Sequence, residues 1–260
     1  EKIKEVDIIL GTDKKGQTYS VYEKFLQDNK KINLVEDISK KQDFEELDVT
    51  SYEERTRAFL KVQDGCNNFC SYCIVPYVRG RERSRQPQDI LAECKALIDS
   101  GAKDITLLGQ NVNSYGKDLN MDIDFADLLK MIADLPGEFL LRFMTSHPRD
   151  ASNKLFDTMA ASKHVARQLH LPFQSGNNRV LQEMNRRYTR EQYLELINYA
   201  KSVMPGLVLT SDVIIGFPGE TEEEAMDTVS LVEEVGFDAL FTFIYSPRPG
   251  TKAAEMPDPA

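Results

Sequence analysis

Three of the four cysteines, Cys66, Cys70 and Cys73, lie close together with the spacing C-x3-C-x2-C. A secreted disulfide framework would spread cysteines in pairs along the chain, so these three are expected to be metal ligands in a reducing compartment. Three thiolates can hold a cubane cluster and leave its fourth iron without a protein ligand, whereas an electron-carrier cluster normally takes four cysteines. The spacing therefore predicts a [4Fe-4S] cluster with one iron open to a substrate.

A zinc site completed by Cys94 or a histidine is the alternative, because clustered cysteines in intracellular proteins are often structural zinc ligands. Zinc ligands usually come in C-x2-C pairs, and Cys94 falls on the apolar stripe of a predicted helix, which indicates a small buried hydrophobe. The alternative function is then a zinc-stabilised nucleic-acid-binding module without catalysis.

The elements that position the cysteines alternate between strands and amphipathic helices from Arg57 onward, which is typical of βα units around a parallel sheet. Six strands are too few for the eight-stranded barrel, so we expect an α/β fold with a partial (β/α)6 barrel. The predicted strands are Ala58–Val62, Ile105–Leu108, Phe139–Met144, Gln168–Leu171, Leu207–Ile215 and Ala239–Tyr245. The predicted helices follow Pro87 and span Phe125–Leu135, Arg190–Val203 and Thr221–Val235.

Polar and glycine-rich segments follow each predicted strand. Functional groups of parallel βα folds gather at the carboxyl ends of the strands, so these segments hold the candidate site residues. The segments are 63–73, 109–113, 145–148, 172–176, 216–220 and 246–250.

The composition favours a cytoplasmic protein. Charged residues make up 28% of the chain, and the sequence has neither an apolar run that could span a bilayer nor a signal-peptide pattern, so no membrane partner is expected. The formal net charge of −10 means that any nucleic-acid contact must come from a local basic patch or from a missing part.

The two ends of the chain indicate a fragment of a longer enzyme. Residues 1–50 contain a strand-like run, Val6–Leu10, a helical stretch, Tyr22–Asn29, and a charged linker, Ser39–Asp48. The acidic, proline-rich end at residues 255–260 reads as a second linker. We therefore expect a short remnant of a preceding α/β domain before the barrel.

The cysteine spacing, with the aromatic Tyr72 before the last cysteine, resembles the radical S-adenosylmethionine (SAM) superfamily. The residues from Gly65 to Arg85 resemble its methylthiotransferase family, and Gly109–Gly116 resembles the tRNA-modifying MiaB branch. Phe217–Thr221 and Ser246–Thr251 add two similar stretches, so that the resemblance covers about residues 55–256.

The resemblance implies a tRNA-2-methylthio-N6-dimethylallyladenosine synthase. Such an enzyme methylthiolates C2 of N6-isopentenyladenosine in the tRNA anticodon loop, using SAM and an electron donor such as flavodoxin or ferredoxin. A methylthiotransferase that acts on another tRNA adenosine or on a ribosomal protein is the alternative within the same class.

The resemblance also implies three parts. Residues 1–50 are expected to be the tail of the N-terminal methylthiotransferase domain plus a linker, and residues 51–256 the radical SAM core. Residues 257–260 would lead to an absent C-terminal TRAM domain. The ligands of an auxiliary [4Fe-4S] cluster are not in this chain.

The expected SAM-binding residues lie at strand ends. A glycine-rich turn at Gly109 brings backbone close to a ligand, as needed for the SAM amino group. Gln174 and Arg186 resemble ribose and carboxylate contacts, and Asp212 resembles an acidic position that binds SAM hydroxyls or a bridging water. His147 and His170 are expected to be packed, non-catalytic histidines. The full cofactor-binding set is Tyr72, Gly109, Gln110, Asn111, Thr145, Ser146, Gln174, Arg186, Asp212 and Ser246.

RNA contacts are expected from four alternating arginines in a loop beside the cluster, Arg79, Arg81, Arg83 and Arg85. They could pair with phosphates, and the neighbouring Tyr77 offers a ring for stacking on a base.

Overall fold

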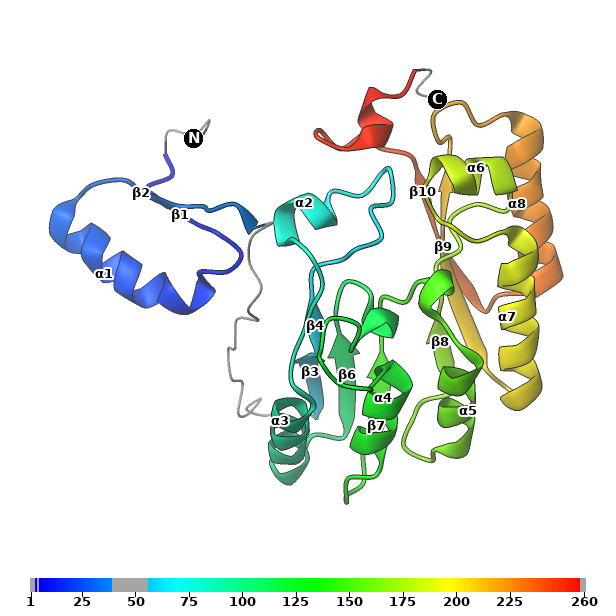
Figure 1. Cartoon of the computed structure of the whole chain (residues 1–260), viewed down its shortest axis with the longest axis horizontal. Helices are drawn as coiled ribbons and strands as arrows, with labels where there is room; N and C mark the ends of the chain where they lie inside the picture. The colour runs from blue at the N-terminus through cyan, green and yellow to red at the C-terminus, as the bar shows by residue number, and fades with distance from the viewer. Residues whose placement is uncertain (1–2, 4, 39–55, 258–260) are drawn as a thin grey trace.

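The fold is a curved arrangement of parallel strands with helices along its outer side (Figure 1), as seen in a computed structural model that describes residues 3, 5–38 and 56–257. Two three-stranded parallel sheets have the orders β3-β6-β7 and β8-β9-β10. The strands are β3 (Arg57–Lys61), β6 (Asp104–Leu108), β7 (Leu140–Phe143), β8 (Gln168–His170), β9 (Val208–Ile215) and β10 (Ala239–Ile244). All six predicted strands are confirmed, with boundaries that differ by one residue.

The two sheets join between β7 and the segment before β8. The Leu141 amide donates to the His164 carbonyl at 2.7 Å, and the Ala166 amide donates to the Leu141 carbonyl at 2.9 Å. A parallel bridge between Leu141 and Val165 results. The six strands thereby follow one another in chain order, which confirms the expected partial (β/α)6 barrel.

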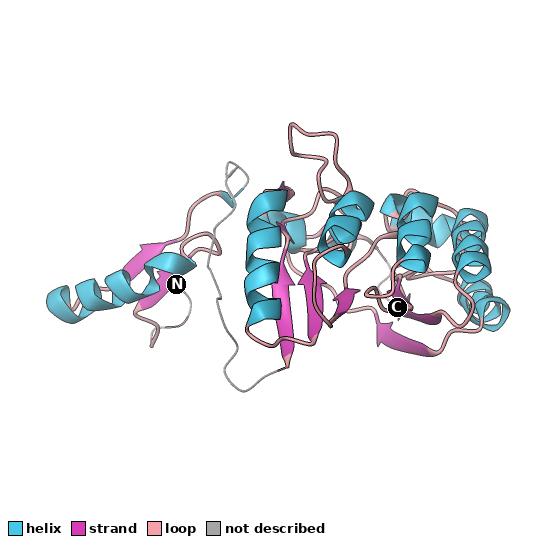
Figure 2. Cartoon of the chain, turned by 90° about the horizontal axis from the view of Figure 1, so that it is seen from below, coloured by secondary structure: helices cyan, strands magenta, loops and turns pink. Residues whose placement is uncertain are grey.

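Helices cover one face of the strands (Figure 2). Ala58 and Leu60 of β3 point toward these helices and are fully buried, whereas Phe59 between them is 46% exposed on the inner face. This alternation is typical of a strand with one covered face. The helices are α3 (Pro87–Asp99), α4 (Phe125–Ala133), α5 (Asn153–Ala161), α6 (Asn178–Glu183), α7 (Arg190–Val203) and α8 (Glu222–Val235).

Short polar signals fix where several helices begin. Thr221 accepts a hydrogen bond from the Glu224 amide while the Glu224 carboxylate accepts one from the Thr221 amide, and Thr189 and Gln192 form the same reciprocal cap on α7. The sequence analysis did not predict α5 and α6. None of the described helices is long and apolar enough to cross a membrane.

Before the barrel, two short parallel strands, β1 (Ile8–Leu10) and β2 (Ile32–Leu34), flank helix α1 (Thr18–Asp28). The predicted strand and helix of this segment are confirmed, and the three-residue β2 was missed. The predicted linker Ser39–Asp48 lies outside the described residues.

Candidate functional site

The cysteine loop leaves the barrel through a tight turn at Gly65. This glycine has φ +77°, and a Cβ atom there would lie 1.9 Å from the Arg81 carbonyl oxygen. Only a residue without a side chain fits such a turn. Gly65 therefore lets the loop double back against the segment that follows the last cysteine.

A small hairpin closes the base of this loop. Strand β4 (Gln63–Asp64) pairs antiparallel with β5 (Arg83–Ser84). The Cys66 amide donates to the Gly80 carbonyl at 3.2 Å. Asn67 donates through its amide and its side chain to the two Glu82 carboxylate oxygens, at 3.1 and 3.2 Å. Both ends of the cysteine loop are thus held together.

The far side of the loop is tied to the turn after α6. Asn185 donates its side-chain amide to the carbonyls of Asn68 and Phe69, at 3.2 and 2.8 Å. Ser71 donates its amide to the Met184 carbonyl at 3.0 Å and its hydroxyl to the Glu183 carbonyl at 2.8 Å. The loop therefore spans the carboxyl end of the barrel, from β3 to the α6 turn.

Hydrogen-bond donors point at the sulfur atoms of this loop. Cys66 and Cys70 are each 9% exposed, and burial raises the pKa of Cys66 to about 12 and that of Cys73 above its usual value. The Asn68 amide donates to Cys66 Sγ at 3.5 Å, and Arg186 Nη1 donates to Cys70 Sγ at 3.6 Å. Buried thiols surrounded by donors fit a bound iron–sulfur cluster, because iron ions favour the thiolate form.

The zinc alternative finds little support around Cys94. This residue lies fully buried on α3 within the main hydrophobic core, together with Ile90 and Leu97. Cys94 is a core residue, as expected.

Four of the predicted SAM residues, from four separate segments, line one cavity of about 370 Å³. They are Tyr72, Gln174, Asp212 and Ser246. The sequence analysis missed five further lining residues, which come from β9, the end of β10 and the segment beyond it: Ile214, Phe243, Ile244, Tyr245 and Arg248.

Gln174 reaches this cavity through an unusual backbone conformation. Its φ is +69°, and its amide donates to the Asp212 carbonyl while its own carbonyl accepts from the Ile214 amide, both at 2.9 Å. His170 Nε2 lies 3.5 Å from an Asp212 carboxylate oxygen. The acidic Asp212 side chain is therefore positioned between a histidine and the cavity.

In the glycine-rich turn after β6, the side chains mainly make contacts that stabilise the fold. Gln110 Oε1 accepts from the Gly65 amide at 2.6 Å, and Asn111, 1% exposed, donates to Asp150 at 2.6 Å. Gly109 packs against Gln63, which a Cβ atom would meet at 3.2 Å. Gln110 thus holds the start of the cysteine loop and Asn111 holds the segment after β7, so the groups available to a ligand here belong to the backbone.

Thr145 and Ser146 follow β7. Thr145 has φ +68° and is exposed, whereas Ser146 is 7% exposed and its hydroxyl has no hydrogen-bond partner among the described residues. The next residue, His147, accepts from the Arg149 amide through Nδ1 at 3.2 Å, while its Nε2 has no described partner. Burial, with the charges of Arg186 and two other cations, lowers the pKa of His147 far below its usual value, so the ring is neutral with its proton on Nε2.

The four arginines do not share a loop, contrary to the prediction. Helix α2 (Val75–Arg79) contains Arg79, and Arg83 lies on β5. Arg83 and Arg85 are each 6% exposed, because Arg83 donates to the Arg79 and Arg81 carbonyls and Arg85 pairs with Glu93 at 2.6 Å. Arg83 and Arg85 are therefore buried and paired, whereas Arg81 is exposed and Arg79, which pairs with Asp64 at 3.4 Å, is partly exposed.

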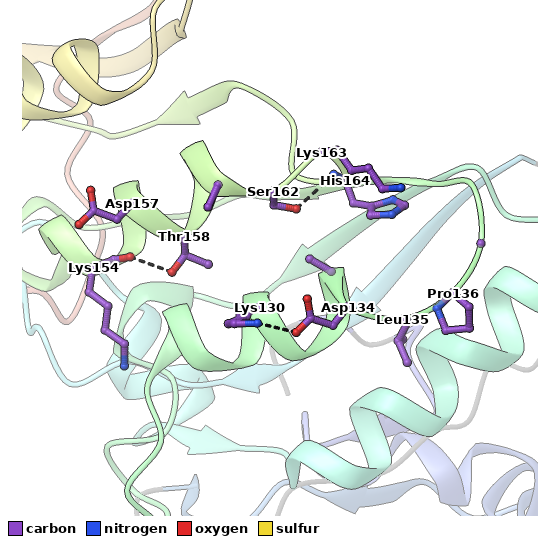
Figure 3. A pocket seen from close by; sticks show the side chains of 13 residues that line it. Lys130, Asp134, Leu135, Pro136, Lys154, Asp157, Thr158, Ser162, Lys163 and His164 are labelled. Atoms are coloured by element: carbon purple, nitrogen blue, oxygen red, sulfur yellow. Dashed lines mark hydrogen bonds and ion pairs between the residues drawn. The ribbon is translucent and has the colours of Figure 1, made fainter.

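A second cavity, of about 860 Å³, lies elsewhere. Figure 3 shows its walls, formed by the ends of α4 and α5 and the loops that lead into the next strands, with Lys130 paired to Asp134. These loops enter β7 and β8 at their amino ends. This cavity is therefore at the opposite end of the strands from the cysteines.

The partial barrel, the three-cysteine loop and the adjoining cavity define a radical SAM protein. A family model described as the radical SAM superfamily matches residues 60–232, and the chain belongs to that superfamily.

Among known proteins, the chain is similar to enzymes named tRNA-2-methylthio-N(6)-dimethylallyladenosine synthase. It is 50% identical to the one from Thermoanaerobacter sp. (strain X514) over 99% of this chain and 54% of that protein. It is 54% identical to the one from Desulfitobacterium hafniense over 78% of this chain and 45% of that protein. The chain spans about half the length of the curated relatives it matches.

Solved structures share the fold at low sequence identity. The radical SAM methyltransferase TsrM from Kitasatospora setae has a TM-score of 0.63 at 19% identity, over 76% of this chain and 38% of that one. The coproporphyrinogen III oxidase HemN from Escherichia coli, a radical SAM enzyme, has a TM-score of 0.56 at 20% identity, over 78% of this chain and 47% of that one.

Proposed function

We propose that this chain is the radical SAM core of a tRNA methylthiotransferase that modifies C2 of N6-isopentenyladenosine beside the anticodon. The observation that carries the proposal is the position of the buried cysteine loop next to the cavity lined by Tyr72 and Asp212. The relatives at about 50% identity, which are named for this tRNA product, support the choice of substrate.

In this proposal Cys66, Cys70 and Cys73 hold a [4Fe-4S] cluster. When bound, the cluster and SAM would supply the one-electron chemistry that removes a hydrogen atom from the substrate. The chain's own residues hold SAM in place and exclude water from the reacting atoms.

The cavity of about 370 Å³ would hold SAM. Gln174 and Asp212 bind the ribose hydroxyls, Ser246 adds a polar contact, and the ring of Tyr72 packs against the ligand. The Arg186 guanidinium, beside Tyr72 at 3.3 Å, attracts the methionyl carboxylate. Backbone groups of residues 109–111 and the Thr145–Ser146 turn bind the amino end.

The RNA side of the proposal involves the outer surface of the cysteine loop. The Arg81 guanidinium lies 4.4 Å from the centre of the Phe69 ring, and Tyr77, 53% exposed, meets that ring edge-on at 5.8 Å. Cations beside exposed aromatic rings suit phosphates and splayed bases. We assign the anticodon-loop contact to this surface and to Arg79.

The complete reaction requires more than this chain. We propose that residues 1–50 belong to a preceding methylthiotransferase domain and linker, 51–256 to the core, and 257–260 to a linker before a TRAM domain. The auxiliary [4Fe-4S] cluster is bound outside this chain. A flavodoxin or ferredoxin supplies the electron, and the enzyme works in the cytoplasm, where tRNA is found.

The cofactor half of the proposal is tested by reconstituting the chain anaerobically and measuring 5′-deoxyadenosine formation from SAM under a strong reductant. The Cys70→Ala variant is expected to give no product. Cys94→Ala is the matched control, since it removes a cysteine from the core and leaves the motif complete; it should retain iron and product. Full product from Cys70→Ala would contradict the proposal.

The substrate half is tested by mass spectrometry of tRNA from cells that lack or carry the full-length gene. Loss of 2-methylthio-N6-isopentenyladenosine on deletion is expected, with recovery on complementation. A change confined to another tRNA adenosine, or to a ribosomal protein, would move the assignment to the corresponding alternative.

A further inference from the structure

Arg186 is a buried cation without a carboxylate partner. The residue is 4% exposed. Its guanidinium donates to the Tyr188 hydroxyl at 3.1 Å, the Pro172 carbonyl at 2.6 Å, the Tyr72 hydroxyl at 3.3 Å and Cys70 Sγ at 3.6 Å. Within residues 3, 5–38 and 56–257, no Asp or Glu forms an ion pair with it.

A guanidinium remains charged in a protein, and burying a charge costs several kcal/mol unless an anion lies nearby. Of the four acceptors, only the Cys70 sulfur becomes an anion when the site is loaded. A cluster held by three thiolates is negatively charged, and Arg186 touches one of those thiolates directly. The positive charge of Arg186 is therefore balanced by the bound cluster and by any anion that binds beside it.

Neighbouring residues fix the guanidinium in this place. Tyr188 accepts from Arg186 Nε and donates its own proton to the Phe173 carbonyl at 2.7 Å. The guanidinium carbon lies 5.3 Å from the centre of the Tyr188 ring. Tyr188 therefore holds the Arg186 guanidinium in its position beside Cys70.

We infer that Arg186 sets the reduction potential of the cluster, raising it so that a cellular donor can reduce it. The inference rests on the proposed function, because it requires the cluster. The redox step is the transfer of one electron from a flavodoxin- or ferredoxin-class donor, which is oxidised, to the cluster, which is reduced. No proton moves, since Arg186 stays protonated throughout.

The direction follows from charge. Reduction adds one negative charge to the cluster, so a fixed cation at hydrogen-bond distance from a ligand sulfur stabilises the reduced form more than the oxidised form. Hydrogen bonds to the sulfur atoms act in the same direction. Arg186 is thus a positioning and tuning residue for the cluster as well as a candidate contact of the SAM carboxylate.

The test is an anaerobic redox titration of the reconstituted chain, without SAM, followed by the electron paramagnetic resonance signal of the reduced cluster. Arg186→Gln is expected to move the midpoint potential to a more negative value. Arg186→Lys keeps the charge and should lie between the glutamine variant and wild type. Arg179→Gln is the matched control, because Arg179 is an exposed guanidinium on α6 that pairs with Glu224; its midpoint should equal that of wild type.

Iron content and a thermal melt are measured first, because a buried substitution can prevent folding. If Arg186→Gln does not load, Tyr188→Phe replaces it, since this variant removes one hydrogen bond that holds the guanidinium and should shift the midpoint in the same direction by less. An unchanged midpoint in a fully loaded variant would overturn the inference and leave the proposed function intact. A wild-type chain that takes up no iron–sulfur cluster would overturn both.

Discussion

Asn185 donates its side-chain amide to two carbonyls of the cysteine loop, those of Asn68 and Phe69, across 116 or more residues of sequence. These bonds connect the turn after α6 to the middle of the segment that presents the thiols. The shape of the cysteine loop therefore depends on Asn185, a residue that lies in none of the sequence motifs.

Asn185→Gly tests this link. Asn185 has φ +58°, which glycine adopts without strain, so the variant removes the amide but keeps the backbone conformation. We expect faster loss of iron on dilution into chelator, and a decrease in unfolding free energy of about 1–2 kcal/mol from the lost bonds. Iron retention equal to wild type would mean that the Ser71 contacts suffice to hold the loop.

The arginines next to the loop separate into structural and RNA-facing groups. Arg85→Ala leaves Glu93, 13% exposed in its side chain, without its partner, and removal of one member of a buried pair costs about 3–5 kcal/mol. Arg81→Ala should leave stability within about 0.5 kcal/mol, because its side chain is exposed, and should weaken binding of an anticodon stem-loop.

Urea denaturation and RNA-binding titrations of the two variants at two salt concentrations would check this division. For Arg81→Ala we expect a smaller dependence of affinity on salt than for wild type, as one phosphate contact is lost. Equal salt slopes would remove Arg81 from the RNA surface.

The sequence predicted the barrel well because apolar strand runs such as Ala58–Val62 alternate along the chain with amphipathic helices such as the one after Pro87. It also placed Tyr72, Gln174 and Asp212 among the candidate residues that line one cavity, since Tyr72 and Gln174 lie in segments that follow strands and Asp212 lies on β9. Strand-end position is a local property that one sequence reveals.

The sequence could not reveal which polar side chains make structural contacts within the fold. Gln110 binds the Gly65 amide and Asn111 binds Asp150, and both bonds join segments that lie far apart in the chain. The hairpin of β4 and β5 has only two residues in each strand, too few for any periodic pattern. Tertiary contacts therefore determine which of these polar residues are structural, and the spacing of residues in the sequence does not show it.

Gly65 and Gly101 form a matched pair for testing the turn into the cysteine loop. Both have positive φ, +77° and +100°, but a Cβ atom at Gly65 would lie 1.9 Å from a carbonyl oxygen and one at Gly101 would meet nothing within 4 Å. Gly101→Ala should cost only the strained conformation, about 1–3 kcal/mol. Gly65→Ala should cost more and also abolish iron binding, which iron analysis and a thermal melt of the two variants would measure.

The neutral, buried His147 predicts an acid-dependent loss of stability. Burial, Arg186 and Arg149 lower the pKa of the folded ring far below its usual value, whereas the unfolded ring titrates near pH 6.5. Below pH ~6.5 the unfolded chain binds a proton that the folded chain does not, so the free energy of unfolding should fall by about 1.4 kcal/mol per pH unit and be insensitive to this group above that pH. His147→Asn keeps an acceptor for the Arg149 amide and cannot titrate, so urea denaturation between pH 5 and 7 should show a shallower slope for the variant; parallel slopes would mean that another group binds the proton.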